Sequence, residues 1–391
     1  MKNVVMIVYT DYHLDARVRR EAETLARTGR FRVSVLTLKR GEKPGVFELQ
    51  GVHVAEVNEK KYSGKSKFGY VFSYLRFLVL CLGRCTRLLF NGEVDIIHVH
   101  NMPDILVFAA AVPRLFGRKL ILDIHDSMPE TYLAKFTGNA SLPYKLLCIE
   151  ESVSAALAHR VVCVNHVQQE VLEGRGIPFD KITISMNVPD PLFFPAGDGP
   201  VPAESTNNTF RMVYHGTIAE RLGVDLTVQA VARLSDRIPG LQFHLWSKPG
   251  PALDAIEQLS RSLNVGDRVR ILRGGVALER LSQELKIMNI GIVSNRRSVA
   301  TDLMLPVKML EYIALGIPVV APTLKCIRYY FTEDMVTFFE PGNVDSMAGA
   351  ITALYQDPAR RQQQAQNARA FLDRYGWENH KNDLIAMYDN L

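Results

Sequence analysis

The sequence of 391 residues has only five cysteines, and these follow no pattern that marks a metal site or a disulfide framework. Cys81, Cys85, Cys148, Cys163 and Cys326 form no C-x-x-C pair. A sparse, odd-numbered set of this kind predicts free buried thiols in a reducing compartment. The excess of basic residues is also small. A net charge of +5 is too low to indicate a nucleic-acid partner by itself, and we expect none.

Three further patterns are absent from the sequence. No Asp-x-Asp occurs, the pair with which metal-dependent transferases bridge Mg²⁺ or Mn²⁺ to a diphosphate, so we expect no metal and no resident cofactor. No G-x-G-x-x-G follows a predicted strand, which disfavours a dinucleotide-dependent oxidoreductase. No uncharged run is long enough to span a bilayer, because Arg76 interrupts the most apolar stretch, residues 68–83.

Short β-branched runs alternate with helical patterns along most of the chain, which predicts parallel sheets covered on both faces. In the first half we expect strands at 3–9, 32–38, 94–100, 119–125 and 160–165, and helices at 16–28, 68–90, 103–116, 143–158 and 166–173. In the second half we expect strands at 210–216, 241–247, 268–273, 290–295 and 318–322, and helices at 223–235, 251–263, 277–287 and 307–315.

A segment rich in Pro, Gly, Asn and Ser, residues 187–208, separates the two halves and predicts a linker. We therefore predict an α/β protein with two doubly wound, Rossmann-like domains. Ligands of such sheets bind outside the carboxyl ends of the strands, so two facing edges would form a cleft. The expected bounds are 1–190 for the first domain, 191–208 for the linker, 209–365 for the second domain and 366–391 for a helical tail that returns to the first domain.

The stretch "LPVKMLEYIALGIPVVAP", residues 305–322, combines a helix start with two charged residues. Pro306 suits the first helical turn, where its missing N–H would have no intrahelical partner. Lys308 then lies where a cation opposes the helix dipole, unless an anion is bound nearby, and Glu311 shares its face of the helix. A lysine for phosphates beside a carboxylate for ribose hydroxyls suits a nucleoside diphosphate. The alternative interpretation is a Lys–Glu pair on the surface.

A second candidate follows the strand at 210–216. The turn "HGT" leads through Glu220 and Arg221 into a helix that Gly223 opens. Backbone N–H groups at such a strand-to-helix turn bind anions, and Arg221 adds a positive charge. Taken alone, this turn is equally consistent with an ordinary loop that carries a solvated arginine.

Several stretches resemble the retaining GT-B enzymes of glycosyltransferase family 4, in the right order over nearly the whole chain. They are "DARVRREAETLARTG" (15–29), "VDIIHVHNMPDILVFAA" (94–110), "KLILDIHDSMPETY" (119–132), "NVPDPLFFP" (187–195), "HGTIAERLGVD" (215–225) and residues 305–322. The resemblance implies a nucleotide-sugar donor, with a UDP-sugar favoured, on the C-terminal domain and the acceptor on the N-terminal domain.

The same resemblance implies roles for individual residues. Glu311 matches the second glutamate of the family's Glu-x7-Glu motif and would hold the ribose, while Lys308 and Arg221 would hold the diphosphate. The first glutamate of that motif falls on Leu303, and the adjacent Asp302 is expected to substitute for it. The remaining donor contacts that the resemblance implies are Gly216, Thr217, Gly274, Leu305 and, from the N-terminal domain, Arg17.

In the N-terminal domain, "LDIHDSMPE" places His125 and Asp126 at the end of a predicted strand. The resemblance makes His125 a contact of the donor sugar or the acceptor, and we include Asp126 with it among the catalytic candidates, with Lys308 and Arg221. Retaining transfer of this kind uses the leaving phosphate to help deprotonate the acceptor, so His125 is not expected to be a nucleophile. His98 and His100 point the same way along their strand and are equally consistent with hydrogen-bonded structural histidines.

Residues 60–90 contain seven basic side chains, no acidic one, and interleaved aromatic residues. On a helix this pattern is typical of a segment in an anionic membrane interface, although a core helix with a solvated basic edge fits about as well. We expect salt-sensitive, peripheral binding on the inner face of the plasma membrane, with the protein otherwise cytoplasmic. Neutralising Lys65, Lys67, Arg76 and Arg84 should weaken it.

Together these observations predict a metal-independent, retaining hexosyltransferase that uses a nucleotide-sugar donor. The expected acceptor is a saccharide or a lipid-linked saccharide in the synthesis of lipopolysaccharide, another cell-surface polysaccharide or a glycolipid. Because Leu303 replaces a glutamate of the family motif, a catalytically silent paralogue that acts as a partner subunit is the main alternative.

Overall fold

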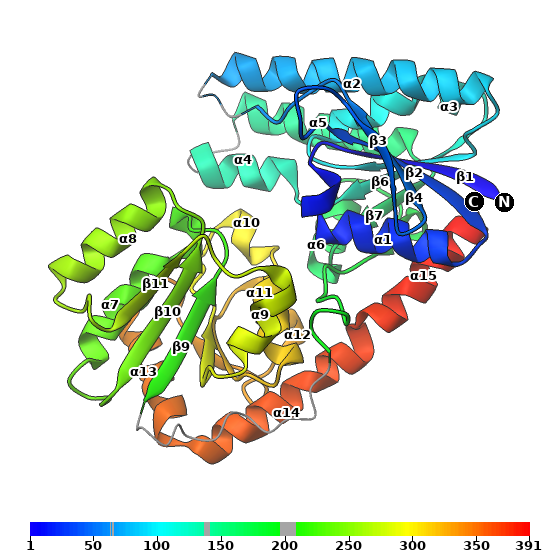
Figure 1. Cartoon of the computed structure of the whole chain (residues 1–391). Coiled ribbons are helices and arrows are strands. Elements are labelled where there is room, and N and C mark those ends of the chain that lie inside the picture. Colours follow the sequence, from blue (N-terminus) through cyan, green and yellow to red (C-terminus); the bar gives the residue numbers. More distant parts are fainter. Residues whose placement is uncertain (63, 65, 137–140, 196–208) are drawn as a thin grey trace. The chain divides into compact units, whose positions relative to one another are not determined.

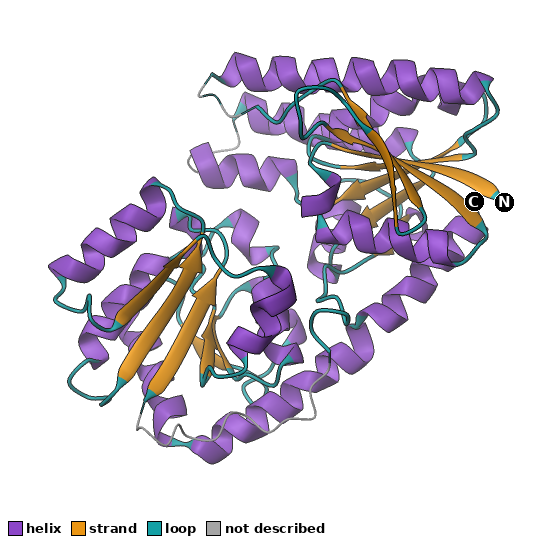
Figure 2. Cartoon of the chain, in the orientation of Figure 1, coloured by secondary structure: helices purple, strands orange, loops and turns teal. Residues whose placement is uncertain are grey.

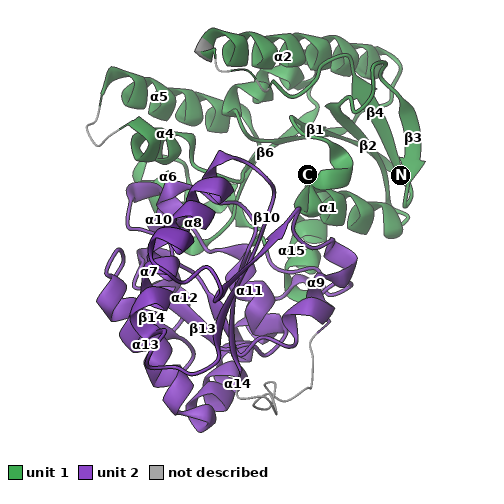
Figure 3. Cartoon of the chain, turned by 60° about the vertical axis from the view of Figure 1, so that its left-hand side comes forward, with its two compact units in different colours: residues 1–187, 378–391 green, residues 188–377 purple. Residues whose placement is uncertain are grey.

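A computed structural model describes residues 1–391 except 63, 65, 137–140 and 196–208, and its chain divides into two compact units (Figure 3). Unit 1 contains residues 1–187 and 378–391, and unit 2 contains residues 188–377. The chain therefore changes units at 187/188 and at 377/378, whereas the sequence suggested 190 and 365. Most of the expected linker, from residue 196 on, lies outside the described residues.

Unit 1 is built on an eight-stranded sheet with the order β3-β4-β2-β1-β5-β6-β7-β8, in which only β3 runs antiparallel to its neighbour (Figures 1 and 2). The strands are β1 (Lys2–Val8), β2 (Phe31–Leu38), β3 (Val46–Leu49), β4 (Val52–Val57), β5 (Ile96–His100), β6 (Lys119–Ile124), β7 (Arg160–Cys163) and β8 (Ile182–Ile184). Strands such as β5 are buried on both faces, although its sequence IIHVH includes two histidines among the apolar residues.

The β3–β4 hairpin was missing from the sequence prediction. Its two turn residues, Gln50 and Gly51, have φ values of 52° and 78°, which suit the tight turn of a two-residue hairpin. The strand β3 has only four residues and lies at the sheet edge, so its sequence carries little strand signal.

Helices cover the faces of this sheet (Figure 2). Phe77, Cys81 and Cys85 of α2 are buried in the core against strand residues. The expected helix at 103–116 begins as the 3₁₀ segment η2. The helices and 3₁₀ segments of unit 1 are η1 (Tyr12–Leu14), α1 (Ala16–Arg27), α2 (Lys67–Phe90), η2 (Asp104–Ala110), α3 (Ala111–Leu115), α4 (Met128–Phe136), α5 (Leu142–Leu157), α6 (His166–Gly174) and η3 (Phe179–Lys181).

The C-terminal helix α15 (Trp377–Asp389) packs on this unit, as expected for a returning tail. Its Tyr388 is fully buried, and its hydroxyl lies 2.6 Å from His98 Nδ1. The Lys2 ammonium donates to the main-chain carbonyl oxygens of Tyr388 and Asp389 at 3.2 and 3.1 Å. The last turn of the chain is thereby joined to the start of β1.

Unit 2 holds a six-stranded parallel sheet with the order β11-β10-β9-β12-β13-β14. The strands are β9 (Phe210–His215), β10 (Leu241–Ser247), β11 (Val269–Arg273), β12 (Ile290–Ile292), β13 (Val319–Pro322) and β14 (Thr337–Phe339). The helices and 3₁₀ segment are η4 (Glu220–Leu222), α7 (Val224–Leu234), α8 (Pro251–Ser262), α9 (Leu278–Leu285), α10 (Val299–Asp302), α11 (Val307–Ala314), α12 (Lys325–Tyr330), α13 (Val344–Gln356) and α14 (Pro358–Tyr375).

The strand order reverses at β1/β5 in unit 1 and at β9/β12 in unit 2. At such a point the connections on the two sides leave in opposite directions, which opens a crevice at the carboxyl ends of the two strands. The prediction of two doubly wound, Rossmann-like domains is therefore confirmed. It also directs attention to the residues that follow β5, β6 and β9.

Candidate functional site

Unit 2 has a pocket of about 430 Å³ at the carboxyl ends of β9, β10 and β11. Three loops form it, one after each strand. Its lining includes His215, Gly216, Thr217, Trp246, Lys248, Gly250, Gly274 and Gly275. Three of the predicted donor contacts, Gly216, Thr217 and Gly274, are therefore in one pocket. Trp246 and Lys248 were not singled out from the sequence.

Gly223 fixes the loop that follows β9. Its φ is 62°, and a Cβ atom here would stand 2.1 Å from the Ser294 carbonyl oxygen, so only glycine fits. Across this close approach, the Ser294 hydroxyl donates to the Leu222 carbonyl at 2.7 Å, and the Arg296 N–H donates to the Arg221 carbonyl at 2.9 Å. The loop is thereby attached to the segment that follows β12.

Lys308, on the first turn of α11, lies beneath this loop. Its Nζ is 3.6 Å from the centre of the Tyr214 ring, and a Cβ atom at Gly216 would stand 3.8 Å from it. Burial lowers the pKa of Lys308 to about 7, and the nearby Glu311 carboxylate offsets only part of this effect. The charged form of Lys308 is disfavoured in the free protein because no anion fully compensates its burial. A bound anion would supply that compensation, so the position is suited to anion binding.

Glu311 lies one turn along α11, and its carboxylate is 3.1 Å from Nε2 of His215. The His215 ring packs edge-on against Tyr312, with 5.3 Å between the ring centroids. The Tyr214 hydroxyl donates to the Thr217 carbonyl at 2.7 Å. The structure thus joins Lys308 and Glu311 to the loop after β9. Tyr214 and His215 hold the two charged residues, a role that the sequence did not suggest for them.

The other predicted donor contacts in unit 2 have different surroundings. Arg221 is exposed on η4, close enough for its charge to lower the pKa of Tyr214, although burial keeps that pKa above its usual value. Leu303 and Leu305 are half-buried between α10 and α11. Asp302 accepts the Lys325 N–H at 3.0 Å with one carboxylate oxygen and so caps α12. Its expected role in place of the missing glutamate of the motif stays a prediction, and the second carboxylate oxygen is the one that would serve it.

In unit 1 a buried ion-pair network surrounds Asp123, near the end of β6. The Arg17 guanidinium donates to both carboxylate oxygens of Asp123, with Nη2 at 2.8 and 3.0 Å, and to the Ser185 carbonyl at 2.8 Å. Its Nε also lies 3.4 Å from the Glu21 carboxylate. Arg17 is only 4% exposed. Its observed partners are therefore carboxylates of its own unit, which differs from the phosphate contact expected for it.

His125 is paired with Asp123, two residues earlier, and the other catalytic candidate of this segment, Asp126, does not contact its ring in the described structure. Its Nε2 lies 2.7 Å from Asp123 Oδ2, whereas Asp126 is exposed and offers its main-chain carbonyl to Asn101 Nδ2 at 2.9 Å. Burial alone would lower the pKa of His125, but the Asp123 carboxylate outweighs it, so that the pKa of His125 is raised. The alternation of Asp123 and His125 in "LDIHD" was the signal that could have revealed this pair.

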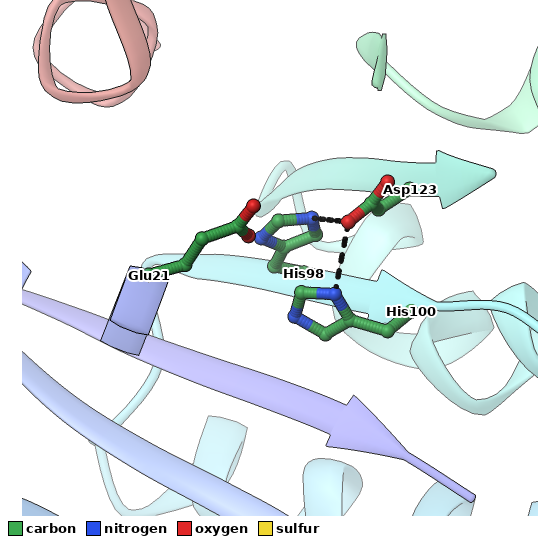
Figure 4. Close-up of side chains that lie close together, drawn as sticks. All are labelled: Glu21, His98, His100 and Asp123. Carbon is green, nitrogen blue, oxygen red and sulfur yellow. Dashed lines mark hydrogen bonds and ion pairs between the residues drawn. The ribbon is translucent and has the colours of Figure 1, made fainter. Parts of the chain in front are cut away.

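His98 and His100 belong to the same network (Figure 4). Their rings are 4.0 Å apart, and His100 Nδ1 is 3.1 Å from Asp123 Oδ2. Together with Glu21 and Asp123 they offer ligand atoms that lie within 4.8 Å of one another, a grouping that could hold a metal ion. Arg17 already supplies the cation to both carboxylates. A divalent ion would therefore have to displace the Arg17 guanidinium. We interpret the cluster as an ion-pair network whose charges balance one another and which positions His125.

Replacing Asp123 is expected to lower the pKa of His125. In the Asp123→Asn protein the burial effect would remain without the carboxylate that opposes it, so His125 should lose its proton at lower pH. In the wild type, protonated His125 stabilises the fold. This contribution is complete below the ordinary histidine pKa of 6.5 and is lost as pH rises through the raised pKa, and it should be smaller in the variant. An NMR titration of the imidazole resonance measures the shift. Asp126→Asn is the matched control and should leave the titration unchanged. An unaltered His125 pKa in Asp123→Asn would contradict the assignment.

The fold and the two sites together define a class. Two Rossmann-like units, with a pocket at the carboxyl ends of β9, β10 and β11 in unit 2 and a His125–Asp123 pair at the carboxyl end of β6 in unit 1, have the architecture of the GT-B glycosyltransferases. Residues 16–188 match the family description "Glycosyltransferase Family 4", and residues 209–357 match "Glycosyl transferases group 1". The chain belongs to this family of glycosyltransferases.

Individual relatives are distant. A D-inositol 3-phosphate glycosyltransferase of Xylanimonas cellulosilytica is 23% identical over 362 residues, which cover 88% of this chain and 84% of the relative. Sucrose-phosphate synthase from Thermosynechococcus elongatus has a similar fold, with a TM-score of 0.81 at 17% identity over 100% of this chain and 99% of that one. The Anabaena protein HepE, whose structure contains UDP, gives a TM-score of 0.70 at 14% identity over the full length of both chains.

Proposed function

We propose that the protein is a retaining glycosyltransferase whose unit 2 binds a nucleotide-sugar donor. The observation that carries the proposal is the position of Lys308. Its ammonium lies over the Tyr214 ring and close to Gly216, and within the described residues it has no ion-pair partner. Glu311, whose carboxylate contacts His215, lies one helical turn away. A diphosphate at Lys308 and Gly216 and a ribose at Glu311 would satisfy both charges.

We propose a UDP-sugar as the donor. The pocket after β9–β11 is large enough for the base, and a structure of similar fold, HepE, contains UDP. His125, with its raised pKa, would offer a proton-bearing ring nitrogen to the donor sugar or the acceptor. The acceptor would attack from the face that the diphosphate leaves, and the departing phosphate oxygen would take its proton.

Lys308 and Arg221 would neutralise the leaving diphosphate without a metal ion. For the acceptor we propose a saccharide or lipid-linked saccharide used in cell-surface polysaccharide or glycolipid synthesis, with the protein on the cytoplasmic face of the membrane. The names of the relatives supply a second acceptor class to test, a small phosphorylated polyol or sugar.

The deciding experiment is donor turnover by the purified chain. UDP-sugars should be hydrolysed slowly without acceptor and transferred with it, and NMR of the product should show the anomeric configuration of the donor. The activity should persist in EDTA, because Lys308 and Arg221 would neutralise the diphosphate in place of a metal. Complete loss on chelation that Mg²⁺ or Mn²⁺ restores would contradict the metal-free site. A chain that binds UDP but never turns over a donor would favour the silent paralogue that Leu303 suggests.

Binding of UDP is expected to take up a proton at pH 8. With a pKa of about 7, Lys308 is roughly nine-tenths neutral at this pH in the free protein, and a bound diphosphate would restore its charge. UDP is already fully ionised there, so it releases none. Isothermal titration calorimetry in buffers of different ionisation enthalpy gives the number of protons taken up, and we expect close to one. In Lys308→Met the uptake should vanish. Uptake that is equal in the variant and the wild type would assign the proton to another group.

A further inference from the structure

Unit 1 exposes an unusual number of large apolar side chains in one part of its sequence. Of the 23 that are exposed in the described part of the chain, 14 lie between residues 68 and 153. They belong to α2, the end of α3, the end of α4 and α5. These 14 are Phe68, Tyr70, Val71, Phe72, Leu75, Val79, Phe90, Leu115, Phe116, Phe136, Leu142, Leu146, Ile149 and Val153.

On α2 most of these side chains form a strip over the first half of the helix, and Phe90 lies on the same line at its end. Phe68, Phe72, Leu75, Val79 and Phe90 recur at helical spacing along about 33 Å of helix, and Phe68 is 88% exposed. By length and composition, residues 68–90 could cross a membrane, but the opposite face of α2 is fixed in the core of unit 1. The helix can therefore lie along an apolar medium, and it cannot span one without unfolding the unit.

A second helix with an exposed apolar side is α5. Leu142, Leu146, Ile149 and Val153 follow one another at intervals of four, three and four residues, so they share one side of the helix. Both α2 and α5 pack on η2, α3 contacts α2, and α4 contacts α5 (Figure 1). We call the 14 side chains on these four helices the apolar platform.

The two longest helices of the platform carry little exposed negative charge. No acidic residue occurs in α2, and the two in α5, Glu150 and Glu151, are half-buried and buried. Arg84 and Arg87 line a pocket of about 370 Å³ between α2 and β4, whose apolar floor includes Leu36, Val57 and Leu80. The pocket also holds Glu56, whose carboxylate accepts the N–H groups of Arg40 and Gly45 at 3.2 and 2.8 Å.

Within the described residues, neither Arg84 nor Arg87 has an ion pair or a side-chain hydrogen bond. Arg76 differs, because it is paired with Glu59 at 3.1 Å. Lys65 lies outside the described residues, and the side chain of Lys67 does too. Other exposed positive charges on the platform helices are Lys135 on α4, next to Phe136, and Lys145 on α5, next to Leu146.

We propose that the apolar platform inserts into the headgroup–acyl boundary of a bilayer, with the Arg84–Arg87 pocket taking an anionic lipid headgroup. The inference rests on the membrane contact in the proposed function. It adds α5 as a second membrane-contacting helix, and it makes apolar insertion, in place of electrostatic attraction, the main source of binding free energy. Apolar contact, which salt does not screen, supplies most of the binding, and the arginines supply the preference for anionic lipid. A second copy of the chain on this face is the alternative occupant, and the test below includes it.

Flotation with phosphatidylcholine vesicles, with and without phosphatidylglycerol, tests the proposal. We expect the wild type to bind both, to prefer the anionic vesicles, and to remain on neutral vesicles at high salt. Phe72→Ser/Val79→Ser on α2 and Leu146→Ser/Ile149→Ser on α5 should each lower the partition coefficient about tenfold or more. Leu272→Ser/Ile287→Ser, which removes two exposed apolar side chains of unit 2, is the matched control and should bind as the wild type does.

Arg84→Gln/Arg87→Gln should bind neutral vesicles normally and lose the preference for phosphatidylglycerol. UDP binding should be unchanged in every platform variant, which separates this proposal from the donor site. The proposal is overturned if the wild type binds neither vesicle, or if the α5 variant binds as the wild type does. It is also overturned if size-exclusion chromatography shows a dimer that the platform variants dissociate, because the face would then be an interface between copies.

Discussion

Lys308→Ala is expected to lower kcat/KM for glycosyl transfer by about tenfold to a hundredfold. The variant loses a charge-assisted contact to the leaving diphosphate, worth roughly 1.5–3 kcal/mol. Its thermal stability should stay the same or rise, because the folded protein no longer has to bury an ammonium group whose pKa is lowered to about 7. A fall in activity without a fall in stability is what separates a binding role from a structural one.

Kinetics and thermal melts of the same preparations make the comparison. Lys286→Ala, which removes an exposed lysine of the same unit just after α9, is the control and should leave both measurements unchanged. Glu311→Gln should raise the KM for the donor by about tenfold, since the amide keeps the shape of the carboxylate and loses its charge. Wild-type kinetics in both Lys308→Ala and Glu311→Gln would refute the placement of the nucleotide.

Arg17→Met is expected to destabilise unit 1 by about 3–5 kcal/mol, the usual cost of removing one partner from a buried ion pair. Asp123 and Glu21 would be left fully buried without the guanidinium that now contacts both. Urea unfolding followed by circular dichroism gives the change in midpoint.

The control for this variant is Arg19, two residues further along the same helix. Arg19→Met removes the ion pair with Glu23 from a side chain that is 32% exposed, and should cost less than about 1 kcal/mol. Arg17→Met/Asp123→Leu should be less destabilised than the sum of its single variants, because no unpaired charge is left at Asp123. Equal shifts for Arg17→Met and Arg19→Met would show that the network around Asp123 contributes little to folding.

The elements that local sequence determines were predicted well. Buried parallel strands such as β5 and β6 consist mostly of β-branched and other apolar residues between turn signals, so their existence follows from composition over a few residues. Their polar residues, such as His98, His100 and Asp123, are too few to hide this pattern. The helix at Lys308 and Glu311 was found for a similar reason, since Pro306 and the spacing of the charged residues are visible in the chain. Short elements with few distinctive residues, such as β3, β8 and β14, were missed.

The partners of the site residues were decided by the tertiary structure. His100 and Asp123 are direct neighbours because β5 and β6 pair in that register, and nothing in either strand's own sequence specifies the pairing. In the same way, Lys308 is buried because β9 places the Tyr214 ring under it, which is why its pKa falls. The apolar strip of α2 could be read from periodicity, but its continuation on α5 depends on both helices packing on η2. A sequence specifies which residues share a face of one element, while contacts between elements arise from strand order and packing over long separations.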